Sequence, residues 1–293
     1  MRRISAVVLA AAAIGIGGLR ADAQTPSIWT DIMSKKKLTV CIVPSYQPYS
    51  WKDSKGEWQG FVAEMARNVA SAMRVEPEFV ETTFKTVVLD LQSAKCHVFF
   101  GFNATPERAL AIDFSGPLYT LGFAFVNGKG WKPPGPGWTD FNSPDIKICY
   151  PIGTSMEQQA KRWAPKAHHV ALGTTDECIL ALQTGRVDTF LTAFLDSLVT
   201  KLKNPNVGEL MFPTPSYALP SYAGMRLDAD GRFQKFLQRW SEYNRANGNI
   251  SEWLIGALEQ YGVPRESLPK DVQFCEHRPI HRKGSQRPCG GIS

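Results

Sequence analysis

The sequence predicts an α/β protein of two lobes, each built on a parallel β-sheet and joined at a hinge. Short apolar segments alternate with segments of helical periodicity, which is typical of parallel sheets covered by helices. The alternation stops at the stiff Pro- and Gly-rich segment 131–137 and then starts again. Without residues 1–23 about 270 residues remain, which is the upper range for a single hydrophobic core.

The first lobe begins with a strand predicted at 38–43, which an aromatic loop follows. Apolar residues at helical spacing predict a helix from Phe61 to Met73. The further elements predicted for this lobe are strands at 78–80, 98–102 and 123–126 and a helix at 87–91. We expect the loops after these strands to meet at one cleft, because parallel strands bind ligands beyond their carboxyl ends.

The second lobe repeats the pattern after the Pro- and Gly-rich segment. Its predicted elements are strands at 146–150, 170–172 and 187–191 and helices starting near Met156 and covering 179–182. A later strand at 221–225 and a helix over 233–240 are too little for a third domain. The chain is therefore expected to return to the first lobe, so that lobe 1 is 24–126 plus 220–262, lobe 2 is 127–219, and 263–293 is a C-terminal tail.

Residues 1–23 have the pattern of a secretory signal peptide. Arg2 and Arg3 precede an uncharged apolar segment, and Ala21-Asp22-Ala23 offers a cleavage site. The apolar segment is shorter than the roughly 20 residues that a membrane-spanning helix needs. We therefore expect an exported, periplasmic protein.

The charge of the chain argues against a nucleic acid as its partner. The formal net charge is +6, and much of the positive excess lies after Pro264. The folded body is thus close to neutral, which argues against nucleic acid as the main partner. A hydrophobic content of 43% is typical of a globular protein.

Six cysteines in an exported chain are expected to form disulfides. Six cysteines allow fifteen connectivities, so the pairing is argued from expected position. Cys41 and Cys96 lie on or beside strands that we place side by side in the first lobe. Cys149 and Cys178 both belong to the second lobe, and the tail contains the last two cysteines. The pairs expected are Cys41–Cys96, Cys149–Cys178 and Cys275–Cys289.

Arg108 is the clearest candidate for a ligand anchor. It comes shortly after the apolar segment 98–102, which is predicted to be a buried strand. A guanidinium group is a planar fork that matches a carboxylate with two parallel hydrogen bonds. Taken alone, an arginine that opens a surface helix is the simpler interpretation.

A second anion-binding signal is Gly153-Thr154-Ser155, where a predicted strand ends and a helix begins. Unpaired backbone N–H groups at a helix N-terminus carry partial positive charge. The simpler interpretation is a plain helix N-cap, which threonine and serine often provide. Together with Arg108 in the other lobe, the pattern favours a receptor for a small carboxylate-bearing molecule.

The chain also resembles a known family, the periplasmic solute-binding proteins of the polar amino-acid ABC transporter type, solute-binding protein family 3. The resemblance covers residues 36 to 262 in unbroken order. It rests on the motifs at 44–51, 60–61, 91–95, 101–108, 111–115, 153–155 and 182–188.

The resemblance implies a periplasmic-binding-protein-like fold whose two lobes close on a ligand. The ligand-binding residues that it implies are Tyr46, Phe84, Gly101, Asn103, Arg108, Thr154 and Ser155. Arg108 would hold the ligand carboxylate, and Tyr46 and Phe84 would be aromatic walls. The resemblance further implies no catalysis and no cofactor. A small anionic or zwitterionic solute and the membrane permease of an ABC transporter are the implied partners, and we expect a monomer.

Two positions depart from the pattern of the family. Amino-acid binders of this type usually carry an acidic residue where Ala193 stands here, and often another where Val43 stands. Asp196 lies three residues beyond the first of these positions. The identity of the solute therefore stays open between amino acids and organic acids.

Two alternatives share the same fold. A periplasmic dehydratase would need an acid or base in the cleft, for which Asp196 and Glu157 are the candidates. A periplasmic accessory protein of a quinoprotein dehydrogenase would share a cysteine near the third strand, as Cys96 is here. In the tail, Cys275, His277, His281 and Cys289 have residue types that bind zinc, but a disulfide is the preferred interpretation.

Overall fold

The computed structural model describes residues 25–268 of the protein. The expected signal peptide and the expected Cys275–Cys289 disulfide lie outside the described residues. The strands of the main sheet are β1 (Lys37–Ile42), β4 (Glu76–Glu81), β5 (Val98–Asn103), β6 (Ile112–Asn127), β7 (Lys147–Pro151), β8 (His168–Leu172), β9 (Thr189–Ala193), β10 (Leu210–Met211) and β11 (Ala218–Arg226). A separate hairpin consists of β2 (Trp51–Lys52) and β3 (Trp58–Gln59).

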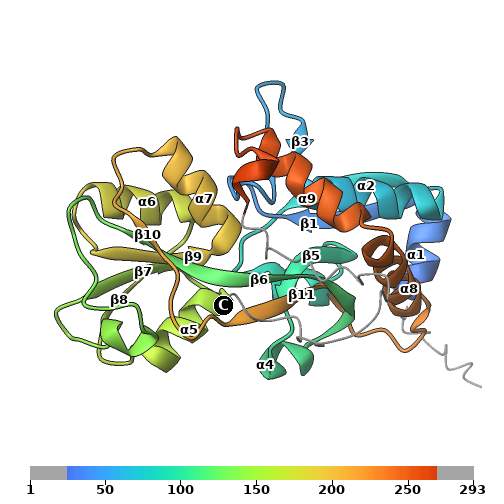
Figure 1. Ribbon diagram of the computed structural model, residues 1–293. Helices are drawn as coiled ribbons and strands as arrows, with labels where there is room; N and C mark the ends of the chain where they lie inside the picture. The colour runs from blue at the N-terminus through green and yellow to red at the C-terminus, as the bar shows by residue number, and fades with distance from the viewer. Residues whose placement is uncertain (1–24, 269–293) are drawn as a thin grey trace, which may run out of the picture.

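Helices cover both sides of this sheet (Figure 1). The α-helices are α1 (Ile28–Lys35), α2 (Phe61–Met73), α3 (Val87–Gln92), α4 (Pro106–Ala109), α5 (Ser155–Trp163), α6 (Thr175–Gln183), α7 (Phe194–Lys203), α8 (Arg232–Ala246) and α9 (Asn249–Glu259). Two 3-10 helices, η1 (Trp138–Phe141) and η2 (Arg265–Ser267), complete the description.

The sheet is mixed, with the order β4-β1-β5-β11-β6-β9-β7-β8 and with β10 paired to β6. At one end β1 pairs in parallel with β4 and β5, and at the other end β7 pairs in parallel with β8 and β9. The two long strands in the middle, β6 and β11, are antiparallel to their neighbours. The predicted α/β class is confirmed, and parallel strands form the core of each half.

Strand β6 is much longer than the strand predicted at 123–126. It pairs with β11 over residues 112–122 and then with β9 over residues 123–127. Many side chains of its first half are only half-buried. A continuous apolar segment therefore marks only the second half in the sequence, because the first half is held by pairing rather than by burial.

We propose that the chain divides into the two lobes expected from the sequence, 24–126 plus 220–262 and 127–219. Figure 1 shows two groups of elements connected by β6 and β11. Helices α8 and α9 come late in the chain and pack on α1, α2 and β6, which belong to the first group. The crossing strands are consequently the hinge of the proposed division.

The loop after β1 is held against α2 by close backbone packing. Gly60 precedes α2 with a φ of 99°, and a Cβ atom there would lie 2.4 Å from the carbonyl oxygen of Tyr49. Glycine is needed at such a position, because other residues would clash and rarely adopt this backbone conformation. The aromatic loop 46–50 is thereby fixed at the carboxyl end of β1.

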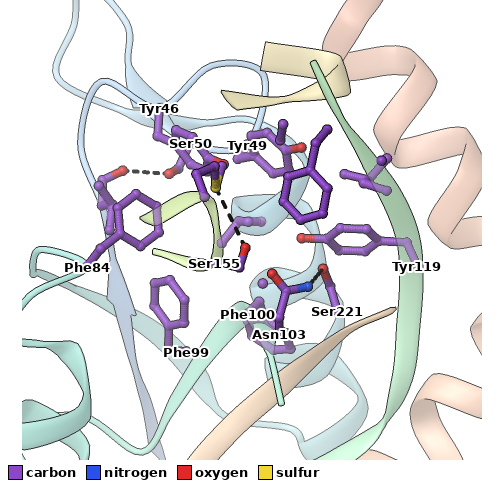
Figure 2. Close-up of a pocket in the computed structure, with 18 residues that line it drawn as sticks. Tyr46, Tyr49, Ser50, Phe84, Phe99, Phe100, Asn103, Tyr119, Ser155 and Ser221 are labelled. Atoms are coloured by element: carbon purple, nitrogen blue, oxygen red, sulfur yellow. Dashed lines mark hydrogen bonds between the residues drawn. The ribbon is translucent and has the colours of Figure 1, made fainter. Parts of the chain in front are cut away.

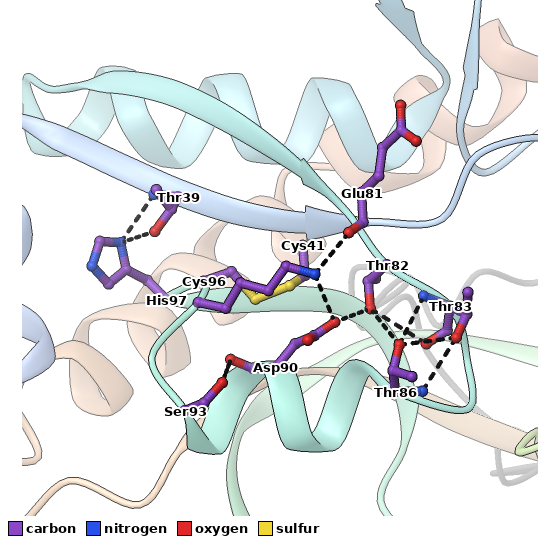
Figure 3. Close-up of a disulfide and its surroundings, with 11 residues drawn as sticks. Thr39, Cys41, Glu81, Thr82, Thr83, Thr86, Asp90, Ser93, Cys96 and His97 are labelled. Atoms are coloured by element: carbon purple, nitrogen blue, oxygen red, sulfur yellow. Dashed lines mark hydrogen bonds and ion pairs between the residues drawn. A yellow bond between two sulfur atoms is a disulfide. The ribbon is translucent and has the colours of Figure 1, made fainter.

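Two disulfides tie elements together inside the lobes. The Cys41–Cys96 disulfide links β1 to the residues just before β5, with a Cα–Cα distance of 5.5 Å (Figure 3). The Cys149–Cys178 disulfide links β7 to α6, with a Cα–Cα distance of 5.8 Å. Both pairs are those expected from the sequence, and all four cysteines are buried.

Removing the Cys41–Cys96 disulfide should destabilise the first lobe. We expect the double variant Cys41→Ser, Cys96→Ser to lose about 2–4 kcal/mol of unfolding free energy, mainly because the unfolded chain is no longer constrained. Urea unfolding followed by tryptophan fluorescence measures this loss.

The control is the wild-type protein unfolded with and without a reductant. Reduction should lower the wild-type midpoint further than it lowers that of the double variant, which retains Cys149–Cys178. Equal unfolding midpoints for the double variant and the oxidised wild type would contradict the prediction.

Candidate functional site

The candidate site is a cavity between the two proposed lobes, at the carboxyl ends of β1 and β5. It consists of a main chamber of about 50 Å³ and a smaller chamber beside it that contains Arg108. All the binding residues implied by the sequence line the smaller chamber, namely Tyr46, Phe84, Gly101, Asn103, Arg108, Thr154 and Ser155. Figure 2 shows the main chamber with aromatic side chains on several sides.

Arg108 is positioned by a short helix immediately after β5. Thr105 caps α4, and its hydroxyl accepts a hydrogen bond from the backbone N–H of Arg108 at 3.4 Å. The guanidinium donates from Nη1 to the carbonyl oxygen of Asn103 at 2.9 Å and from Nη2 to that of Gly153 at 2.8 Å. Its Cζ atom lies 4.7 Å from the centre of the Phe102 ring. Arg108 thus contacts both proposed lobes.

The charge of Arg108 is held by neutral groups. No ion pair joins it to a carboxylate within the part of the chain that the structure describes. Burial lowers its pKa to about 10, and the nearby Glu107 partly opposes this shift. The guanidinium is therefore still a cation at neutral pH, and it keeps donor hydrogens for an anion.

The loop 153–155 brings the N-terminus of α5 to the same chamber. Gly153 has a φ of 79°, and a Cβ atom there would lie 2.9 Å from the carbonyl oxygen of Phe84 in the other lobe. Glycine is therefore what allows the lobes to approach so closely. Thr154 is the N-cap of α5 but makes no side-chain capping hydrogen bond, so backbone donors of the first helical turn stay available to a ligand.

The side chains of this loop have unequal roles. The Thr154 hydroxyl donates to the carbonyl oxygen of Pro151 at 2.6 Å, so its hydrogen is used within the loop. The Ser155 hydroxyl contacts the sulfur of Met156 at 3.7 Å, which is a weak interaction. Ser155 is thus the better hydroxyl donor for a ligand in this chamber.

Glu157 stabilises the loop rather than facing the cavity. It accepts a hydrogen bond from the backbone N–H of Gly153 at 2.8 Å and pairs with Lys161 at 2.6 Å. Burial opposes the ionisation of Glu157, but its bonds to Lys161 and Gly153 outweigh burial and lower its pKa. These contacts explain the carboxylate without a catalytic role.

An aromatic wall forms one side of the cavity. The rings of Tyr46 and Tyr49 are stacked with centres 4.4 Å apart, and Phe84 meets Tyr46 edge-on at 5.0 Å. Backbone hydrogen bonds between Tyr46 and Ser50 close the loop that carries the two tyrosines. Burial raises the pKa of both tyrosines well above the ordinary value, so both phenols are neutral.

The hydroxyl of Tyr49 is a buried polar atom of the aromatic wall. It makes no hydrogen bond of ordinary geometry within the described residues, although it lies beside the hydroxyl of Tyr46. Buried hydroxyl groups are normally hydrogen-bonded. The Tyr49 hydroxyl is consequently a position where a ligand can donate or accept one hydrogen bond.

Asp196 lies in the first turn of α7 and is almost fully buried. The hydroxyl of Thr192 donates a short hydrogen bond to its carboxylate. Burial raises the pKa of Asp196 to about 7, with Thr192 opposing the shift. Its negative charge contributes to the raised pKa of Tyr46 and Tyr49, which indicates that it lies near them.

Several residues of the cavity were not identified from the sequence. Tyr119 and Ser221 come from β6 and β11, which place them as directly paired neighbours. Tyr49 lies in the aromatic loop, and the clustering of aromatic residues there was its signal. Met156 carried no signal for a binding role beyond its position next to a motif, and Val43 was noted only as a position where the resembled family often has an acidic residue.

The buried His97 has a structural explanation, and the cysteines and histidines of the tail lie outside the described residues. The Nδ1 atom of His97 accepts a hydrogen bond from the backbone N–H of Thr39 at 2.9 Å, and its Nε2 lies 2.9 Å from Asp31. His97 is thus a packed residue between α1 and β1. Among residues 25–268 no group of three potential metal ligands gathers, and the tail cysteines and histidines are not described.

The mixed sheet with helices on both sides is an α/β fold of the periplasmic-binding-protein type. The sequence profile of the bacterial extracellular solute-binding proteins, family 3, matches residues 38–136. Over these residues, about a third of the chain, the protein is similar to this family. No helix in residues 25–268 is long and apolar enough to cross a membrane.

Known relatives match over most of the chain. The lysine/arginine/ornithine-binding periplasmic protein of Escherichia coli is 24% identical over 183 residues, which is 61% of this chain and 69% of the relative. The histidine-binding periplasmic protein of Escherichia coli is 24% identical over 221 residues, which is 71% of this chain and 82% of the relative.

Solved structures share the fold. The ancestral amino acid-binding protein AncCDT-1, described as a precursor of cyclohexadienyl dehydratase, has a TM-score of 0.70 and 26% identity. The alignment covers 78% of this chain and 97% of that protein. An amino acid ABC transporter substrate-binding protein from Streptococcus pneumoniae, bound to L-arginine, has a TM-score of 0.71 and 22% identity over 79% of this chain and 98% of its own.

The raised pKa of Asp196 predicts a loss of stability as the pH rises. A carboxyl group whose pKa is higher in the folded state than in the unfolded state stabilises the fold while it is protonated. This stabilisation is lost as the pH rises and the group ionises. The loss should begin near the ordinary value of 3.8 and be complete above about 7. A difference of this size between the unfolded-state and folded-state pKa corresponds to a loss of at most about 4 kcal/mol of unfolding free energy.

The variant Asp196→Asn isolates this effect, because an amide cannot ionise but can still accept the Thr192 hydrogen bond. Urea unfolding at about pH 5 and about pH 8 should show that the variant gains stability relative to the wild type at the higher pH. Asp145→Asn changes an exposed aspartate and is the control. The same pH-dependence in the wild type and Asp196→Asn would contradict the prediction.

Proposed function

We propose that this protein captures a small carboxylate-bearing solute, an amino acid or a related organic acid, in the periplasm and presents it to the membrane permease of an ABC transporter. The observation that supports the solute class is the buried guanidinium of Arg108 between the two lobes. It is a cation without a carboxylate partner in the described residues, and the uncapped N-terminus of α5 lies next to it.

The physical argument is a balance of charge. A buried cation held only by carbonyl dipoles and an aromatic ring is stabilised less than one paired with an anion. A ligand carboxylate in the smaller chamber would pair with Arg108 and accept hydrogen bonds from the first turn of α5. Both contacts would join the lobes, so the closed arrangement would be favoured when the solute is bound.

The relatives support the proposed class of solute. Those compared above are named for binding amino acids, and two of them are named as periplasmic. We propose that this protein acts as a monomer, because each cavity is formed within one chain. The permease is proposed from the family and from the names of the relatives.

Replacing Arg108 is the direct test. A panel of amino acids and organic acids is first screened by thermal shift, and the strongest binder is used for calorimetry. Arg108→Ala should weaken binding by about 2–5 kcal/mol, the usual result of removing one partner of a buried charged pair. Arg108→Lys should also bind poorly, because an ammonium group cannot reproduce the planar fork.

Two further variants calibrate this result. Thr154→Ala should cost less than Arg108→Ala, because the Thr154 hydroxyl already donates to Pro151 and the backbone donors remain. Arg239→Ala removes an exposed arginine that pairs with Glu242 and should leave affinity unchanged. Unchanged affinity in Arg108→Ala would contradict the anchor and favour the accessory-protein alternative.

A further inference from the structure

We propose that the cavity selects carboxylates whose remaining part is apolar, either aromatic or branched aliphatic, and that it rejects the basic amino acids. This inference rests on the proposed function, because it assumes that Arg108 holds the carboxylate. It narrows the solute class by asking which side group the main chamber can accept.

The main chamber has an apolar and uncharged lining. Its aromatic members are Tyr46, Tyr49, Phe84, Phe99, Phe100, Tyr119 and Phe123. Its aliphatic members include Val43, Val62, Leu121 and Met156. None of the residues that line it is Asp, Glu, Lys, Arg or His, and the smaller chamber adds a single charge, that of Arg108.

The polar side chains of the lining are mostly used by the protein itself. Ser50 donates its hydroxyl hydrogen to the carbonyl oxygen of Val43 at 2.5 Å. The amide of Asn103 donates to the carbonyl oxygen of Pro220 at 3.1 Å and also contacts Ser221. The hydroxyls of Tyr49 and Ser155 have only a neighbouring hydroxyl and a weakly accepting sulfur beside them, so both can bond to a ligand. Two hydroxyl groups suit an uncharged polar atom but cannot neutralise a cation.

A guanidinium or ammonium side group would therefore enter this chamber without a counter-ion. Moving a cation from water into an apolar cavity is costly unless it is paired. The buried carboxylate of Asp196 does not line either chamber and is held by the hydroxyl of Thr192. Ala193, which lies one helical turn before Asp196, is on the chamber wall instead.

An apolar group fits the same surroundings. The stacked pair Tyr46 and Tyr49 and the edge-on Phe84 present ring faces and edges, and an aromatic ligand group gains from both arrangements. Burying a ring or a branched chain among these side chains removes apolar surface from water. The chamber is therefore suited to a solute such as phenylalanine, leucine or phenylpyruvate.

Isothermal titration calorimetry with defined probes tests this selectivity. The wild-type protein is titrated with L-phenylalanine, L-leucine and phenylpyruvate, and with L-arginine and L-lysine under the same conditions. At least one apolar probe should bind at least about tenfold more tightly than either basic amino acid. Arginine or lysine binding as tightly as the best apolar probe would overturn the inference.

A pair of matched variants at Val43 tests whether the absence of a negative charge causes the selectivity against basic amino acids. Val43→Asp introduces a carboxylate into the chamber wall and should raise the ratio of arginine affinity to phenylalanine affinity at least about tenfold. Val43→Asn has nearly the same shape without the charge and should not raise this ratio. Equal ratios in the two variants would overturn the electrostatic explanation, and thermal melts establish that both are folded.

The outcomes also separate this inference from the proposed function. Arginine binding that is strong in the wild type and lost in Arg108→Ala would overturn the apolar selectivity and leave the carboxylate anchor standing. Failure of every probe to bind the wild type would overturn the inference, and failure of the wider screen of acids would then also count against the proposed function.

Discussion

The arrangement of the site depends on one interaction, the hydrogen bonds from the Arg108 guanidinium to carbonyl oxygens of both proposed lobes. The Asn103 carbonyl belongs to the end of β5, and the Gly153 carbonyl belongs to the loop before α5. A side chain from one lobe thus fixes the distance to the other. Because its pKa is still about 10, the group stays charged, and the cleft carries a positive charge that no described carboxylate neutralises.

Close packing elsewhere in the cleft fits this closed arrangement. Gly153 lies against the backbone of Phe84, where a Cβ atom would clash. On α7, the Lys203 ammonium lies 3.8 Å from the centre of the Tyr261 ring, which follows α9 of the other lobe. The main chamber of about 50 Å³ is far smaller than the roughly 300 Å³ of small binding sites. The proposed solute would therefore have to enter while the proposed lobes are apart, and the contacts that span the cleft would have to break and form again.

The sequence predicted those parts of the site that depend on local patterns. Arg108 follows a buried strand, and Gly153 stands between a strand and a helix, so both positions could be assigned to the carboxyl edge of a sheet. Both described disulfides could be predicted because each joins neighbouring elements of one lobe. These features need only short stretches of chain to be recognised.

The parts that were missed depend on long-range pairing or on the direction of single bonds. Tyr119 and Ser221 meet only because β6 and β11 pair in one register, and that register brings together residues about a hundred positions apart. The role of Thr154 depends on where its hydroxyl hydrogen points, which is set by the folded loop. The length of β6 was missed because pairing with β11 stabilises its first half more than burial does.

The position of the acidic residue decides what the cleft can recognise. A carboxylate at position 193 or 43 would lie on the chamber wall, where it could pair with a cationic ligand, but Ala193 and Val43 stand there. One helical turn further on, Asp196 is withdrawn into the packing of α7, where burial raises its pKa to about 7. A group in that environment is partly protonated at neutral pH, so it offers a weak and incomplete negative charge. The wall thus combines a full positive charge at Arg108 with a largely neutral remainder, which is complementary to an anion with an apolar body.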